Sequence, residues 1–74
     1  DFGIIALRVN EPFYLQKNRY RVSVATNRVS DKSFYNVEIC RNNMWQLTVI
    51  SKSTMAECLL TLAKKLRNRE EIVK

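Results

Sequence analysis

Two strand-like runs flank a pair of adjacent asparagines, and this arrangement constrains the fold more than any other stretch of the chain. The runs span residues 34–41 (FYNVEICR) and 44–50 (MWQLTVI), with Asn42-Asn43 between them. Asparagine tolerates the left-handed backbone that a two-residue hairpin turn requires. The sequence therefore predicts an antiparallel hairpin. Its expected core-facing side chains are Tyr35, Val37, Ile39, Trp45, Leu47 and Val49.

Two further strands are expected before this hairpin. The run at residues 3–9 (GIIALRV) is apolar on both faces, and Glu11-Pro12 ends it because proline cannot donate to a ladder. The second strand is predicted over residues 13–25, with an irregularity near residues 16–18, and a polar loop follows over residues 26–33. Alternation within the second strand predicts two faces. Tyr20, Val22 and Val24 form the apolar face, and Lys17, Arg19 and Arg21 form a basic row on the other.

A single helix is expected after the strands. Thr54 and Glu57 have the spacing of a capping box at its start, and the helix is predicted to end near Arg69. Apolar residues then recur at helical spacing, which gives the helix one stripe to bury. They are Met55, Leu59, Leu62 and Leu66. The sequence predicts an α+β fold, in which an antiparallel four-stranded meander carries the C-terminal helix across one face.

Length and composition bound the rest of the architecture. The 74 residues indicate a single small domain, residues 1–74, too small for a deep walled active site. The start at Asp1 rather than methionine suggests a fragment of a longer protein. Cys40 falls in a strand pattern and Cys58 in a helix pattern, so we expect free thiols and an intracellular location.

The residue types that most enzymes use are scarce. Histidine is absent, which removes the usual general base and the commonest metal ligand. Cys40 and Cys58 are too few for a zinc site, and the lone Gly3 excludes a glycine-rich phosphate loop. We therefore expect no catalytic residues, no metal and no cofactor, and a chain that is not an enzyme.

The charge balance points to acidic partners. Thirteen basic and seven acidic residues give a formal charge of +6, which favours nucleic acid, anionic lipid or an acidic protein surface. The candidate binding residues are Arg8, Lys17, Arg19, Arg21, Arg28, Lys32 and the apolar Phe34. The plain alternative for the basic row is a solvated strand face whose charges discourage edge pairing.

Four segments, in their order along the chain, resemble one known family. They are EPFYLQ (11–16), YNVEIC (35–40), WQLTVIS (45–51) and AECLLTLAKKL (56–66). They are similar to the C-terminal kinase-associated regulatory domain of AMP-activated-type protein kinases, and the resemblance covers most of residues 11–66. It implies a non-catalytic role, docking on anionic phospholipid, on a partner subunit or on a kinase domain.

The order of elements and the charge allow other interpretations. In both respects the chain also resembles the Whirly-like single-stranded nucleic-acid binders, which usually pair as dimers. Kinetochore-type dimerisation domains, which also combine a small sheet with a terminal helix, are a third possibility. The leading hypothesis is an interaction or regulatory module whose basic sheet face docks on an acidic protein surface or an anionic membrane. Single-stranded nucleic-acid binding, with a homodimer, is the alternative.

Overall fold

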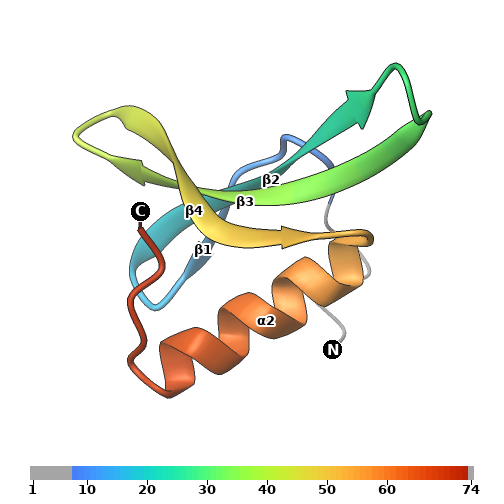
Figure 1. Cartoon of the computed structure of the whole chain (residues 1–74). Helices are drawn as coiled ribbons and strands as arrows, with labels where there is room; N and C mark the ends of the chain where they lie inside the picture. Colours follow the sequence, from blue (N-terminus) through green and yellow to red (C-terminus); the bar gives the residue numbers. More distant parts are fainter. Residues whose placement is uncertain (1–7, 74) are drawn as a thin grey trace.

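A four-stranded antiparallel sheet lies over one helix in the computed structural model, which describes residues 8–73 (Figure 1). The elements are β1 (Phe13–Leu15), β2 (Asn18–Asn27), β3 (Lys32–Arg41), β4 (Met44–Lys52) and α2 (Met55–Arg67). Each strand pairs antiparallel with the next one in the chain, and the sheet order is β1-β2-β3-β4. The predicted α+β meander with a C-terminal helix is confirmed.

The identities of the first two strands differ from the prediction. The strand expected over residues 3–9 lies almost wholly outside the described residues, and Arg8 and Val9 are exposed and belong to no strand. The single strand expected over residues 13–25 is wrong, because it divides into β1 and β2. Gln16 and Lys17 form a two-residue turn between them, with φ of 51° and 69°. The division falls within the irregularity predicted near residues 16–18, but neither residue type favours positive φ, so a tight turn was not expected there.

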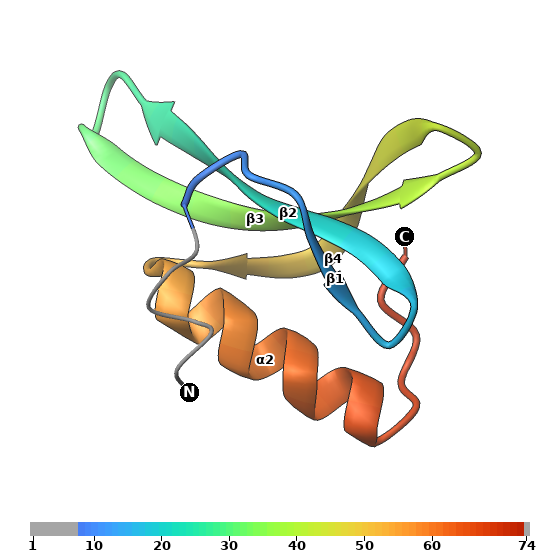
Figure 2. The same cartoon turned by 180° about the vertical axis from the view of Figure 1, so that it is seen from behind.

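The other two hairpin connections use conventional turn residues. Asn42 and Asn43 have φ of 54° and 62°, which confirms the predicted turn between β3 and β4. The Asn27 side chain accepts hydrogen bonds from the Val29 and Ser30 backbone N–H groups, at 2.9 and 3.2 Å. That Asx-type turn carries the chain from β2 into β3. Both of these hairpin tips rise on the side opposite α2 (Figures 1 and 2).

The ends of α2 have well-defined caps. The Thr54 hydroxyl accepts a hydrogen bond from the Glu57 N–H at 3.2 Å, as the capping-box pattern predicted. The helix ends at Arg67, two residues before the expected position, and Arg69 takes a left-handed backbone with φ of 57°. The Glu70 N–H then bonds to the Lys65 carbonyl at 2.8 Å, which completes a Schellman motif.

The core lies between the sheet and α2. Its buried hydrophobic residues are Tyr20, Val22, Val37, Ile39, Ile50, Cys58, Leu59, Leu62 and Ile72. The helix stripe is as predicted, with Met55 and Leu66 partly buried at its ends. Val24 departs from the prediction, since it is 43% exposed toward the β2–β3 tip. Ile72 joins the core because the tail returns to β4, where the Val49 N–H bonds to the Ile72 carbonyl at 2.7 Å.

The prediction that Trp45, Leu47 and Val49 face the core is wrong. Thr48 and Ile50 are the β4 residues buried under α2, while Leu47 and Val49 are 52% and 48% exposed on the opposite face. The two-residue turn determines which face of the sheet Trp45 occupies, because it pairs Trp45 with Cys40. Cys40 follows the core residue Ile39 and therefore points to the face opposite the core. The ladder is irregular opposite Val37, where the Thr48 hydroxyl donates to the Val37 carbonyl at 2.7 Å.

Candidate interaction surface on the open sheet face

The sheet face opposite α2 carries alternate side chains of β2, β3 and β4, together with Tyr14 of β1. Strand register brings them into rows, so that Arg21 lies opposite Glu38 and Glu38 lies opposite Leu47. We call this surface the open sheet face. Its members are Tyr14, Arg19, Arg21, Ser23, Ala25, Phe34, Asn36, Glu38, Cys40, Trp45, Leu47, Val49 and Ser51. No helix or strand between residues 8 and 73 covers it (Figure 1).

Arg21 is fixed at the middle of the open sheet face. Its Nη2 donates to Glu38 Oε1 at 3.0 Å, and its guanidinium carbon lies 4.4 Å from the centroid of the Trp45 ring. The side chains of Arg21 and Glu38 are only 30% and 11% exposed. The ion pair neutralises the charge of Arg21, and stacking on an aromatic ring adds about 0.5–1 kcal/mol at such a site. Arg21 is therefore a rigid part of the surface rather than a free anion ligand.

Arg19 supplies a positive charge on this surface that no described carboxylate neutralises. It lies opposite Tyr14 on one side and Cys40 on the other, and its guanidinium carbon is 5.8 Å from the Trp45 ring centroid. Its side chain is exposed and has no carboxylate partner among the described residues. Trp45 thus lies beside two arginines, of which Arg19 remains available to a carboxylate or phosphate.

Apolar side chains extend the surface beyond the arginines. Leu47 and Val49 are about half exposed, Phe34 is 45% exposed and Tyr14 is 73% exposed. Single exposed apolar residues are ordinary, but several on one uncovered sheet face are typical of an interaction site. Tryptophan, tyrosine and arginine are also the residues enriched in protein interfaces.

The basic row and the other predicted basic residues are not assembled as one patch. Only Arg19 and Arg21 come together, and Arg21 is already paired with Glu38. Lys17 is in the β1–β2 turn, Arg28 is in the β2–β3 loop and Lys32 begins β3. The ten residues of β2 separate Lys17 from Arg28, which is roughly 33 Å at 3.3 Å per residue.

The other two predicted binding residues lie apart from that pair. Arg8 is exposed before Asn10, whose N–H bonds to the Val22 carbonyl at 2.7 Å. Phe34 is on the open sheet face opposite Ala25, toward the tip of the β2–β3 hairpin. Sequence reasoning missed Trp45, Leu47 and Val49 as surface residues. The signal was present, because a two-residue turn at residues 42–43 dictates that residue 45 faces the same way as residue 40.

Two buried titratable groups on the helix side, Cys58 and Tyr20, are part of the core. Burial raises the pKa of the Cys58 thiol, which donates to the Tyr35 carbonyl at 3.1 Å. Burial also raises the pKa of Tyr20, and the Asn18 side chain and Arg41 partly offset that rise. Both cysteines are free thiols. Across residues 8–73, no three histidine, cysteine or carboxylate side chains gather as metal ligands would.

Comparison of the chain with models of protein families, with curated proteins and with solved structures finds no significant match. Among residues 8–73, the structure contains no helical segment with the length and hydrophobicity of a membrane span.

Proposed function

We propose that this chain is a non-catalytic interaction module whose open sheet face binds an acidic partner protein. The observation that carries the proposal is Arg21, held by Glu38 against Trp45 and flanked by the exposed Arg19 and Leu47. Tryptophan and arginine dominate the binding energy of many protein interfaces. A prearranged arginine–tryptophan pair also loses little conformational entropy on binding.

The charge of the chain favours an acidic partner over a second copy of itself. Each copy carries a formal charge of +6, so self-association would bring like charges together. A two-fold pairing through the open sheet face would also bury two copies of Arg19, which has no carboxylate partner on that face among the described residues. An acidic partner would instead gain from electrostatic steering during association.

The proposal agrees with a regulatory role of the kinase-associated type, in which such a module docks on a partner subunit or kinase domain. The two free cysteines support an intracellular location, since disulfides form mainly in oxidising compartments. The regulatory role and the intracellular location are both part of the proposal.

A displayed peptide library tests the proposal with a matched pair of variants. The wild-type domain should enrich peptides that combine carboxylates with bulky apolar side chains. Leu47→Asp should lose this binding, because it puts a carboxylate beside the arginine–tryptophan pair. Leu60→Asp is the control, since Leu60 is 62% exposed on α2, away from the open sheet face. Equal binding by wild type and Leu47→Asp would refute the proposal.

A second candidate function is single-stranded nucleic-acid binding. The observation in its favour is that Tyr14, Arg19 and Trp45 share the open sheet face, since proteins bind unpaired bases with aromatic rings and arginines. A fluorescent oligonucleotide titrated across a salt series tests it. Steep salt dependence and a loss with Arg19→Ala, but not with Arg67→Ala, would favour this candidate. Pelleting with anionic but not neutral vesicles would instead favour membrane docking.

A further inference from the structure

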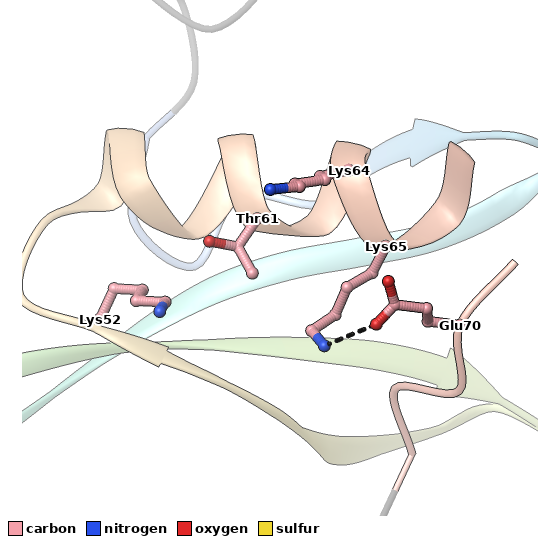
Figure 3. A pocket seen from close by; sticks show the side chains of 5 residues that line it. All are labelled: Lys52, Thr61, Lys64, Lys65 and Glu70. Carbon is pink, nitrogen blue, oxygen red and sulfur yellow. Dashed lines mark hydrogen bonds and ion pairs between the residues drawn. The ribbon is translucent and has the colours of Figure 1, made fainter. Parts of the chain in front are cut away.

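A second surface, on the helix side of the sheet, forms a cationic hollow of about 360 Å³. It lies between the end of β4, the second half of α2 and the chain that follows the helix (Figure 3). Its lining residues are Lys52, Thr61, Lys64, Lys65 and Glu70. Lys52 is the last residue of β4 and pairs with Tyr35, which packs against the core on the helix side of the sheet. The hollow is therefore separate from the open sheet face.

The lining is rich in hydrogen-bond donors. Thr61, Lys64 and Lys65 lie three and four residues apart on α2 and so share one face of the helix. Lys52 projects toward them from the sheet (Figure 3). Three lysines and one threonine thus line the hollow, beside a single carboxylate residue, Glu70. Such a set of donors suits an anion with several acceptor oxygens.

Glu70 already occupies part of this site. Its carboxylate lies 3.2 Å from the Lys65 amine, as an anion's oxygen would. The Schellman motif positions it there, because the Glu70 N–H bonds to the carbonyl of the same Lys65. Lys52 and Lys64 have no ion-pair partner within residues 8–73. The hollow therefore keeps two unpaired lysines beside a lysine that holds an internal carboxylate.

We propose that this hollow binds clustered phosphate groups, and that Glu70 competes with them for Lys65. A single phosphate could reach only some of the lining lysines, whereas a molecule with two or three phosphates could contact Lys52 and Lys64 and displace Glu70 from Lys65. The volume of the hollow, about 360 Å³, is sufficient for such a ligand. The phosphates can belong to a soluble polyphosphate or to a lipid headgroup, because the recognising chemistry is the same.

Soluble phosphates are tested by nuclear magnetic resonance titration of the isotopically labelled domain at constant ionic strength. Inorganic phosphate and tripolyphosphate are the probes. Saturable shifts should centre on the amides of residue 52, residues 61–65 and residues 69–71, with tripolyphosphate binding more tightly. The Lys52→Ala/Lys64→Ala double variant should weaken binding by about tenfold or more, since each removes a charged hydrogen bond.

Two matched controls separate a site from general charge attraction. Lys17→Ala/Lys32→Ala removes the same charge from the turn and strand that lie outside the hollow, and should change affinity little. Glu70→Gln should tighten binding by about two- to fivefold, as expected for removal of an exposed competing charge. Glu71→Gln removes the same charge one residue further along, outside the lining, and should have a smaller effect.

Vesicles distinguish the two sources of phosphate. Phosphatidylcholine vesicles carrying phosphatidylinositol bisphosphate are compared with vesicles carrying phosphatidylserine at equal surface charge. Saturation by tripolyphosphate without selective binding to the bisphosphate vesicles assigns a soluble ligand, and selective binding to the bisphosphate vesicles assigns a headgroup. The proposal is overturned if neither tripolyphosphate nor the bisphosphate vesicles saturate the hollow. It is also overturned if Lys52→Ala/Lys64→Ala and Lys17→Ala/Lys32→Ala weaken binding equally. Binding of peptides at the open sheet face is a separate measurement, which the Lys52→Ala/Lys64→Ala variant should leave unchanged.

Discussion

Replacing Thr48 by valine should destabilise the fold, because one buried hydroxyl bridges the irregular part of the β3–β4 ladder. The Thr48 hydroxyl donates to the Val37 carbonyl at 2.7 Å and accepts from the Ile50 N–H at 3.2 Å, and Thr48 is 3% exposed. The regular register stops at Val37, between Asn36 and Glu38. The hydroxyl thus forms hydrogen bonds with the Val37 carbonyl and the Ile50 N–H where the β3–β4 ladder is interrupted.

The magnitude follows from these two hydrogen bonds. Each contributes about 0.5–1.5 kcal/mol net, and its loss leaves a buried backbone group without a partner. The extra methyl group of valine returns about 0.8 kcal/mol through burial. We therefore expect Thr48→Val to lower the free energy of unfolding by about 1–2 kcal/mol. For a domain of this size that lowers Tm by roughly 4–16 °C.

Urea and thermal unfolding, followed by circular dichroism, measure this loss. Thr61→Val is the matched control, since Thr61 is half-buried on α2 and its hydroxyl makes no hydrogen bond within the described residues. It should change stability by no more than about 0.5 kcal/mol. The reasoning about the ladder is refuted if Thr48→Val is as stable as the wild type, or if both variants lose the same amount.

Three further predictions concern the helix end and the cysteines. Arg69→Gly should raise Tm, because glycine relieves a left-handed backbone that costs about 1 kcal/mol in other residues, whereas Arg67→Gly inside the helix should lower it. The Lys65 side chain lowers the pKa of Glu70 in the folded state. The stability that this pair adds is therefore fully present above the pKa that Glu70 has in the unfolded chain, and it is lost as the pH falls through the pKa of Glu70 in the folded protein. Carboxyl resonances of Glu70 titrated with and without Lys65→Ala measure that shift, which should become smaller in the variant, where Asn68 still donates to the carboxylate. Cys58, buried and with a raised pKa, should react with a thiol reagent far more slowly than the partly exposed Cys40 in the native protein, and equal rates would contradict this packing.

Local patterns in the sequence were sufficient to predict an element and its buried face where one face of that element is clearly apolar. The leucine spacing of α2, its threonine cap and the Asn42-Asn43 turn each have a direct physical cause, and the structure confirms all three. β4 was harder because both of its faces carry apolar residues. Hydrophobicity favoured burying Trp45, whereas hairpin register placed it on the face of Cys40.

Other features were not accessible from local patterns. The turn at Gln16-Lys17 uses residues without a positive-φ preference, so the sequence indicated an irregularity near residues 16–18 but not a turn that divides the strand in two. Ile72 reaches the core only because the Schellman motif turns the tail back toward β4. The hollow beside Glu70 depends on the same reversal, and it joins residues that are 18 positions apart, from Lys52 to Glu70. Such long-range contacts arise from tertiary packing rather than from sequence periodicity.

Trp45, Leu47 and Val49 belong to the open sheet face and not to the core. Comparing the free energies of unfolding of Leu47→Asp and Ile50→Asp tests it most directly, since the two residues lie on opposite faces of β4 and are 52% and 1% exposed. Leu47→Asp should fold, with a loss below about 1.5 kcal/mol, because half of the side chain is already in water. Ile50→Asp should lose more than about 4 kcal/mol. Equal losses would mean that the β4 face bearing Leu47 is core, and would contradict the account.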